Sequence, residues 1–254
     1  MLREQFDLHG KIALVTGSSQ GIGKGIALGL AEFGAEVIVL YHSGKREAEE
    51  VAKEIKKTGQ KAHLFQSDLS KPKSVEKLHK ALIAQKLYPD ILVINASVQV
   101  AKNWDEVTEK DFNYQVDTNL KSTLQLFQKF IPPMLEKGWG RVVTIGSVQQ
   151  EKPHPAMIVY AATKAAVDNM VKNVAIQVAE QGVTVNNLAP GVIATPRLDE
   201  PVPEVEERIN QRMTTPIGDI GEPLDCAAMA LLLCSEAGKF ITGQNFYVDG
   251  GMSL

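Results

Sequence analysis

The sequence has few of the residues that mark disulfide-rich or metal-binding proteins. Only two of its 254 residues are cysteine, and both Cys226 and Cys234 fall in the apolar stretch CAAMALLLC. Such a stretch favours two buried, reduced thiols over a disulfide. The five histidines are scattered without the spacing of metal ligands, so no metal site is expected.

The sequence also lacks a strong charge of either sign and long apolar runs. Its net charge of -3 leaves no basic stripe of the kind that binds nucleic acid. No segment is long and apolar enough to span a bilayer, and the start, MLREQFDLHGKIALVTG, is neither a signal peptide nor a transit sequence. We therefore expect a soluble cytoplasmic protein with no nucleic-acid or membrane partner.

The sequence does have the alternating pattern of an α/β protein. With 44% hydrophobic residues it can bury the core of one domain, which we expect to span residues 1–254. Helical segments separate seven apolar runs that are typical of buried strands, and these runs cover residues 11–16, 35–41, 61–66, 90–97, 141–147, 183–190 and 244–251. This alternation predicts a single-domain, Rossmann-type doubly wound parallel sheet with helices on both faces.

A glycine-rich turn follows the first predicted strand. Gly17, Gly21 and Gly23 lie between the apolar run and a helical segment. Glycines at this point let backbone N–H groups and the positive end of a helix approach a pyrophosphate, which predicts a dinucleotide site. The spacing Gly-x3-Gly-x-Gly differs from the commoner Gly-x-Gly-x2-Gly, so a turn that needs glycine only for packing stays open as the alternative.

A hydroxyl, a phenol and an ammonium group occur together in the second half. Tyr160 and Lys164 are four residues apart in a helical pattern, so both side chains project from one face. A phenol with a pKa of about 10 needs a nearby positive charge to act near neutral pH, and Lys164 is placed to supply it. Ser147 ends a strand-like run, at the edge where parallel sheets bind ligands. The Tyr-Lys pair alone is a weak pattern that ordinary helix-surface residues also produce.

The end of the second predicted strand indicates which nucleotide is bound. No acid occurs there before Glu47, whereas a ribose without a 2′-phosphate is usually held by Asp or Glu. We therefore predict a preference for NADPH/NADP+, with Ser43, Lys45 and Arg46 as contacts of the 2′-phosphate. NADH/NAD+ stays possible, because these charges are also what a solvated loop would carry.

These segments resemble the short-chain dehydrogenase/reductase family over nearly the whole chain. Residues 16–23 are similar to its TGxxxGxG cofactor loop, and Ser147 with Tyr160 and Lys164 to its catalytic core. Asn119, in VDTNL, falls where the family has a fourth catalytic residue. The resemblance implies an NAD(P)-dependent enzyme with these cofactor contacts in addition to the three named above: Gly17, Ser19, Gln20, Gly21, Ile22, Gly23, Asp68, Leu69, Asn95, Ala96, Tyr160, Lys164, Pro190, Gly191, Ile193 and Thr195.

The resemblance also implies a mechanism. Ser147 and Tyr160 would donate hydrogen bonds to a carbonyl oxygen as hydride arrives at its carbon, and Tyr160 would give up its proton. Lys164 would lower the pKa of the phenol and hold the nicotinamide ribose, and Asn119 would position a water molecule that resupplies the proton.

One position departs from the family pattern. The usual NNAG after the fourth strand is replaced here by Ile94-Asn95-Ala96-Ser97. The side chain of Ser97 would either restrict the approach of the backbone to the cofactor or take up a hydrogen bond, and the sequence does not decide between these.

Substrate selection should lie in the loop after Ser147 and in a proline-interrupted segment, at about 192–215, that has the length of a lid. Gln149 and His154 in the loop and Arg197 in the lid are candidate substrate contacts beside Ser147 and Tyr160. They favour reduction of a ketone or aldehyde on a small polar compound, such as a sugar, a sugar acid or a keto-acid derivative. Polar loop residues that only face water are the alternative interpretation.

Three further expectations stay open at this point. A 3-oxoacyl-[acyl-carrier-protein] reductase is the alternative function, and Lys121, Lys129 and Lys172 are candidates for the basic patch that an acidic carrier would need. A nucleotide-sensing regulator without turnover is a hypothesis from another class, although it would not need the Ser, Tyr and Lys set. The resemblance also implies a homotetramer or homodimer.

Overall fold

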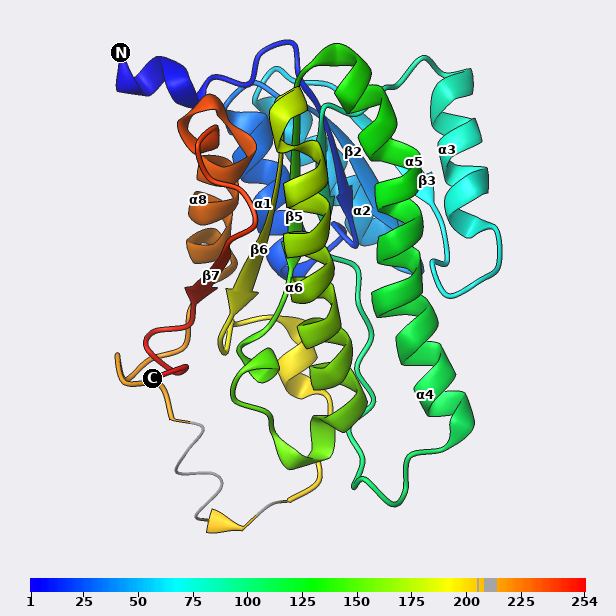
Figure 1. The fold of residues 1–254 in the computed structure, drawn as a ribbon, viewed down its shortest axis with the longest axis vertical. Coiled ribbons are helices and arrows are strands. Elements are labelled where there is room, and N and C mark those ends of the chain that lie inside the picture. The colour runs from blue at the N-terminus through cyan, green and yellow to red at the C-terminus, as the bar shows by residue number, and fades with distance from the viewer. Residues whose placement is uncertain (205, 208–213) are drawn as a thin grey trace.

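One parallel sheet forms the centre of the molecule (Figure 1). The computed structural model describes residues 1–204, 206–207 and 214–254, and the strand order within these residues is β3-β2-β1-β4-β5-β6-β7. Every neighbouring pair is parallel. The strands are β1 (Ile12–Thr16), β2 (Glu36–Tyr41), β3 (Ala62–Gln66), β4 (Ile91–Ile94), β5 (Gly140–Ile145), β6 (Val183–Pro190) and β7 (Asn245–Val248). The predicted fold class is confirmed.

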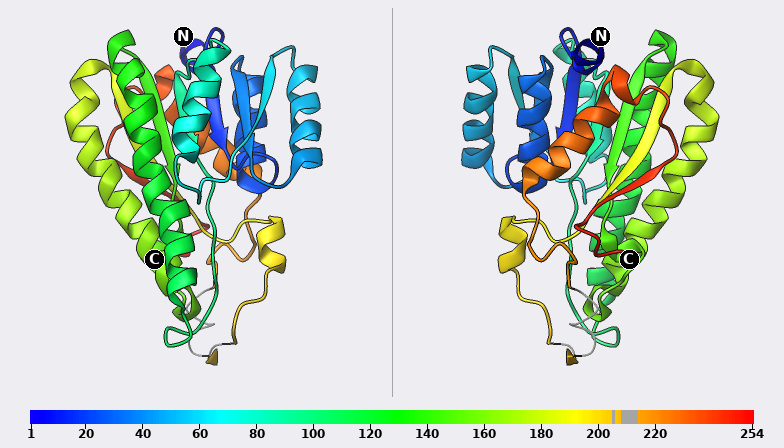
Figure 2. Two further views of the ribbon diagram at one scale, coloured as in Figure 1. Left: turned by 90° about the vertical axis from the view of Figure 1, so that its right-hand side faces the viewer. Right: turned by 90° about the vertical axis from the view of Figure 1, so that its left-hand side faces the viewer.

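Helices cover both faces of the sheet (Figure 2). The longer ones are α1 (Gly21–Glu32), α2 (Lys45–Lys57), α3 (Ser74–Ala84), α4 (Glu109–Gln115), α5 (Ser122–Lys137), α6 (Ile158–Val178) and α8 (Pro223–Cys234). Apolar side chains of α1, α2 and α8 pack with one set of strand residues, and those of α3, α5 and α6 pack with the other set. Alternate residues of each strand thus enter different layers of the core, as a doubly wound sheet requires.

The order of the strands determines where a ligand can enter. From β1 the chain runs outward through β2 and β3, and then returns to the other side of β1 to form β4. The connections above β1 and β4 therefore diverge at the carboxyl ends of these strands. A crevice at this switch point is where open α/β sheets bind ligands.

The long helical segment predicted between β4 and β5 is not one regular helix. Its middle, Val116–Lys121, is a π-helical turn between α4 and α5. Pro132 and Pro133 lie inside α5. Gly138 caps the end of this helix in the left-handed conformation. Single π-turns are rare and occur often at functional sites, and this one carries Asn119.

Both thiols lie in α8 or at its end, and the expectation of buried reduced cysteines is confirmed. Cys226 and Cys234 are unbonded and fully buried. Burial raises the pKa of each thiol to about 12, so neither is a thiolate at neutral pH.

None of the helices in the described residues has the length and apolar content that crossing a bilayer requires. The structure contains one copy of the chain, so the expected dimer or tetramer stays a prediction.

We predict opposite effects of alanine at two glycines of α1, where this helix crosses α8. A Cβ at Gly25 would lie 2.9 Å from the Cβ and the carbonyl oxygen of Pro223, whereas one at Gly29 would lie 3.4 Å from the Cβ of Ala227. Gly25→Ala should lower the melting temperature by about 2–6 °C, because overpacking outweighs the gain in helix propensity. Gly29→Ala, the matched control, should leave it unchanged or raise it, and equal effects would contradict the packing argument.

Candidate active site

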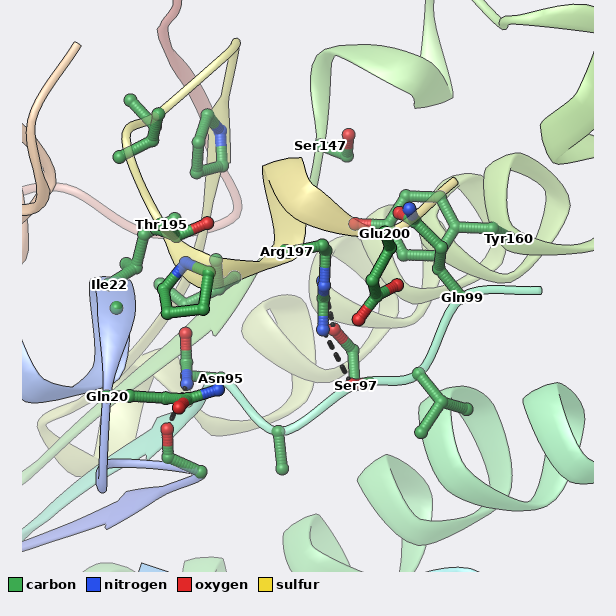
Figure 3. Close-up of a pocket in the computed structure, with 18 of the residues that line it drawn as sticks. Gln20, Ile22, Asn95, Ser97, Gln99, Ser147, Tyr160, Thr195, Arg197 and Glu200 are labelled. Carbon is green, nitrogen blue, oxygen red and sulfur yellow. Dashed lines mark hydrogen bonds between the residues drawn. The ribbon is translucent and has the colours of Figure 1, made fainter. Parts of the chain in front are cut away.

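A cavity of about 920 Å³ opens at the carboxyl ends of the strands (Figure 3). All five predicted substrate contacts line it, namely Ser147, Gln149, His154, Tyr160 and Arg197. So do most of the predicted cofactor contacts, namely Gly17, Ser19, Gln20, Gly21, Ile22, Ser43, Asp68, Leu69, Asn95, Ala96, Tyr160, Lys164, Pro190, Gly191, Ile193 and Thr195. The fold therefore brings residues from the two halves of the chain to one place.

The glycine turn is held against the end of β4. The Asn95 side-chain amide donates to the carbonyl oxygens of Thr16 and Gly17, at 3.0 and 2.9 Å. Gly17 has a φ of +63°, and a Cβ on it would lie 2.9 Å from the Cα of Ala96. Gly23 leaves room for the Asn95 amide, since a Cβ there would approach its nitrogen to 2.4 Å. Gly23 thus packs behind the turn and lies outside the lining of the cavity.

Lys45 and Arg46 do not line the cavity, and their contact with a 2′-phosphate stays a prediction. Both lie outside the cavity on the first turn of α2, where each pairs with a glutamate four residues on, at 3.9 and 3.3 Å respectively. Residues 45 and 46 also expose 72% and 86% of their side chains. The lining at this point comes instead from Ser19, Ser43 and the N-cap residue of α2, Gly44.

Asp68 and Leu69 line the same end of the cavity, after β3. Although partial burial disfavours the charged carboxylate, hydrogen bonds from Ser70 and the nearby charges of His42 and Lys71 hold the pKa of Asp68 below its ordinary value. Its Oδ1 accepts from the backbone N–H and the hydroxyl of Ser70, at 3.0 and 2.6 Å. Asp68 is therefore an ionised acceptor at neutral pH.

Ser147 follows β5 and is fixed by the loop that it begins. Its Oγ accepts the backbone N–H of Gln149 at 3.2 Å. The Gln150 side-chain oxygen accepts from the Ser147 backbone N–H at 3.3 Å and from the buried Asn187 amide at 3.2 Å. Asn187 in turn accepts from the Thr144 hydroxyl at 2.6 Å. Ser147 is thus anchored to β5 and β6 by a polar network, while its hydroxyl can still donate.

The phenol and the ammonium group come from α6, as the spacing predicted. The Lys164 ammonium lies 5.5 Å from the centre of the Tyr160 ring and donates to the Ile145 carbonyl oxygen at 2.5 Å. Lys164 is buried at the wall of the cavity, and this burial, with a smaller repulsion from Arg197, lowers its pKa to about 7. Lys164 therefore changes its charge near neutral pH when the cavity holds no anion.

Asn119 lies behind the cavity and does not line it. Its side-chain oxygen accepts the Val98 backbone N–H at 2.8 Å, and its amide nitrogen donates to the Val98 carbonyl and to the Thr163 hydroxyl, at 2.9 and 3.2 Å. Both N–H groups of the amide are thus used within the protein. The geometry joins the loop after β4 to α6, and the water-positioning role inferred for Asn119 stays a prediction.

The loop after Ser147 presents ordered polar side chains. The Gln149 side-chain oxygen accepts the His154 backbone N–H at 2.7 Å, and His154 Nδ1 accepts the Ala156 N–H at 3.2 Å. Burial holds the pKa of His154 below its ordinary value. His154 is therefore neutral at pH 7, and both side chains are held in place rather than free in solvent.

Arg197 reaches across the cavity to the unusual serine. Its Nη1 donates to Ser97 Oγ at 3.1 Å and its Nη2 to the Ser97 carbonyl oxygen at 2.8 Å, as Figure 3 shows. Ser97 thus takes up a hydrogen bond, which is one of the two outcomes that the sequence left open. Residues 205 and 208–213 of the predicted lid lie outside the described residues, whereas Leu198, Glu200 and Val202 line the cavity.

Several lining residues were missed by the sequence reasoning. Gln99, Tyr114 and Met252 contribute to the cavity, and no local motif marks them. The partnership of Gln150 with Asn187 was also missed, because it joins a loop to a strand 37 residues away.

Comparison with known proteins identifies the family. A family model described as enoyl-(acyl carrier protein) reductase matches residues 17–253. A 3-oxoacyl-[acyl-carrier-protein] reductase of Staphylococcus aureus is 36% identical over 244 residues, which cover 96% of this chain and 98% of the relative. The chain belongs to the short-chain dehydrogenase/reductase family. It is accordingly an oxidoreductase of the NAD(P)-dependent kind, and a regulator without turnover is not supported.

Two solved structures show how closely this fold is shared. One is a 3-oxoacyl (acyl-carrier-protein) reductase of Agrobacterium tumefaciens with NADP bound, 37% identical, with a TM-score of 0.90 over 99% of this chain and 97% of that chain. The other is a putative 2-deoxy-D-gluconate 3-dehydrogenase of the same organism with bound NADP, 32% identical, with a TM-score of 0.86 and 98% of each chain covered. The two related proteins therefore share the fold although they are named for different substrates.

We predict that burial of Lys164 makes stability depend on pH. Below pH 7 this lysine is charged in both the folded and the unfolded protein, so the full cost of burying the charge is present. Between pH 7 and its ordinary pKa of 10.5, the unfolded state holds the proton and the folded state does not, so stability rises with pH. Lys164→Met should therefore raise the melting temperature most at pH 6 and less at pH 9.

The matched control is Lys172→Met, which removes an exposed lysine from the same helix. Thermal unfolding at several pH values should give no comparable trend for this variant. A stabilisation by Lys164→Met that is the same at pH 6 and pH 9 would contradict the lowered pKa of Lys164.

Proposed function

We propose that this chain is an NADPH-dependent reductase that converts a ketone or aldehyde of a small polar compound to an alcohol. A sugar, a sugar acid or a keto-acid derivative is the favoured class. The observation that carries this proposal is the set of fixed polar groups beside Ser147 and Tyr160, which are Gln149, His154 and Arg197. Such groups bind hydroxyl and carboxylate groups through hydrogen bonds.

The residues present fit a dinucleotide with a 2′-phosphate. The close approach of Gly17 and Gly23 to the β4 loop leaves a bare backbone at the start of α1, where a pyrophosphate is favoured. Ser19, Ser43 and the backbone N–H groups of Arg46 and Glu47 would offer donors to a phosphate at the end of β2, while the Lys45 N–H donates to the Ser43 carbonyl at 3.0 Å. The NADP in the two related structures supports the same preference here.

The chemistry follows from where charge develops. When bound, NADPH supplies the hydride that reaches the carbonyl carbon of the substrate. The Ser147 hydroxyl and the Tyr160 phenol would donate to the carbonyl oxygen as it becomes negative, and such donors stabilise the transition state more than the ground state. Tyr160 would also transfer its proton to that oxygen as a general acid.

Lys164 would have two roles in this scheme. Its ammonium lies 5.5 Å from the centre of the Tyr160 ring, so its positive charge would stabilise the negative charge that develops on the phenol as the proton leaves. Its ammonium also has donors beyond the one given to the Ile145 carbonyl, and these would hold the nicotinamide ribose. Asn119 would act by fixing the Val98 loop against α6.

One observation favours the second candidate function, 3-oxoacyl-[acyl-carrier-protein] reduction. Relatives with that name are 35–36% identical to this chain. Against it, two of the three lysines considered for a carrier-docking patch are neutralised within their own helices. Lys121 pairs with Asp117 at 3.0 Å and Lys172 with Asp168 at 2.6 Å. The small polar substrate is therefore the better supported proposal.

A substrate panel with NADPH tests the proposal. We expect oxidation of NADPH with keto sugars or keto sugar acids, at a higher kcat/KM than with an acetoacetyl thioester. Tyr160→Phe should reduce kcat by about 10²- to 10⁴-fold, as expected for the loss of a general acid, with NADPH binding retained. A clear preference for the thioester would favour the second function, and near-normal turnover by the Tyr160 variant would refute the mechanism.

Cofactor preference provides a separate test of the end of β2. Ser43→Asp places a negative charge where the 2′-phosphate would lie, so kcat/KM for NADPH should fall. The ratio of kcat/KM for NADPH to that for NADH should fall by about tenfold or more. Lys45→Gln is the matched comparison, because its side chain pairs with Glu49 and does not line the cavity. A larger loss of NADPH preference in Lys45→Gln than in Ser43→Asp would assign the phosphate contact to Lys45.

A further inference from the structure

The contact between Ser97 and Arg197 joins two segments that are 100 residues apart. Ser97 follows β4, and Arg197 lies in the short 3₁₀ turn Pro196–Asp199 after β6. Both oxygen atoms of Ser97 accept from the same guanidinium, at 3.1 and 2.8 Å. Two bonds to one residue fix the plane of this guanidinium, which a single contact would not do.

This arrangement leaves one side of the guanidinium available. A guanidinium has five N–H donors, of which Ser97 takes one from Nη1 and one from Nη2. The Nε–H and one N–H on each terminal nitrogen remain. The Nε and Nη side of arginine is a geometry that binds a carboxylate with two parallel hydrogen bonds.

Arg197 forms no close ion pair with an acid in the part of the chain that the structure describes. No carboxylate of these residues lies within 4.0 Å of the guanidinium, although Glu200 lines the same cavity beside it (Figure 3). The acids Glu47 and Asp68 line the other end, near Ser43. Arg197 is also near enough to the catalytic centre to repel the proton on Lys164.

We propose that Ser97 and Arg197 form a subsite for a carboxylate group of the substrate, beside the carbonyl that Ser147 and Tyr160 would hold. The inference rests on the proposed reductase function and narrows its substrate class to keto acids, sugar acids among them. Arg197 supplies the charge and the paired donors. Ser97, at the position of the family glycine, is the specificity-determining residue because it orients them.

A phosphate of the cofactor is the competing ligand for Arg197. Thr195, two residues earlier, is among the predicted cofactor contacts and lines the same cavity. The two possibilities differ in what the loss of Arg197 weakens. A carboxylate subsite affects acidic substrates only, whereas a cofactor contact affects NADPH binding.

Two pairs of probe substrates isolate the carboxylate. 5-Keto-D-gluconate differs from L-sorbose, and 2-keto-D-gluconate from D-fructose, by a carboxylate in place of a hydroxymethyl group. For each enzyme, the ratio of kcat/KM for the acid to that for the neutral sugar is measured with NADPH. Comparing this ratio between variants removes the fraction of each sugar that is in the open-chain form.

We expect the wild type to prefer at least one acid over its neutral partner. Arg197→Met should lower the acid-to-neutral ratio about ten- to a hundredfold, as expected for loss of a charged hydrogen-bonded pair. The ratio for Arg197→Lys should lie between those of the wild type and Arg197→Met, because lysine keeps the charge but lacks the planar guanidinium. Ser97→Ala and Ser97→Gly should lower the ratio about three- to tenfold, which is the effect of one hydrogen bond. Glu200→Gln, the matched control in the lining of the same cavity, should not lower the acid-to-neutral ratio.

Several results would overturn the inference. A wild-type ratio near one, or an Arg197→Met variant that loses acid and neutral sugar equally, would show that no carboxylate is recognised. A matching rise in the Kd for NADPH, measured by the fluorescence of the bound cofactor, would assign Arg197 to the cofactor instead.

A binding measurement separates this inference from the proposed function. D-Gluconate and D-glucitol differ by the same carboxylate, and calorimetry of each with the enzyme–NADP+ complex needs no turnover. If no sugar is reduced but D-gluconate binds more tightly than D-glucitol through Arg197, the proposed function fails and the subsite stands. If sugars are reduced but D-gluconate shows no such advantage, the subsite fails and the reductase stands.

Discussion

Asn95 and Ala96 donate four hydrogen bonds to the end of β1, and the rest of the site depends on them. Two go from the Asn95 amide to the carbonyl oxygens of Thr16 and Gly17, and two go from backbone N–H groups to the buried Thr16 hydroxyl. They satisfy polar groups at the ends of β1 and β4, where the connections from these two strands diverge, and they fix the glycine turn against the β4 loop. The next residue, Ser97, then lies where it can meet Arg197.

The site also depends on a lysine, Lys164, that is buried beside Ser147 and Tyr160. The Lys164 ammonium donates to the Ile145 carbonyl at the end of β5, two residues before Ser147. Asn187 and Gln150 hold the Ser147 backbone from the neighbouring strand. The proposed catalytic groups are thus positioned by strand ends and by a polar network that the core surrounds. Side chains held in this way need little reorganisation during a reaction.

The sequence predicted the elements and the strand ends better than the side-chain contacts. Buried strands and glycine turns leave local patterns, so the cavity residues from the two halves were found without a structure. Lys45 and Arg46 lie outside the cavity lining, and each pairs with a glutamate four residues further along, a spacing that is visible in the sequence. The partnership of Ser97 and Arg197 leaves no local pattern, because it depends on how strands β4 and β6 are arranged in the sheet. The π-turn at Asn119 was likewise hidden within a helical pattern.

The repulsion between Arg197 and Lys164 couples two binding events. Since the guanidinium disfavours the proton on Lys164, any anion that neutralises it makes that proton more favourable. Coupling of this kind is reciprocal, so protonation of Lys164 strengthens anion binding by the same factor. Uptake of an acidic ligand would therefore draw a proton from solution. The affinity for that ligand would weaken as the pH rises above the pKa of the lysine.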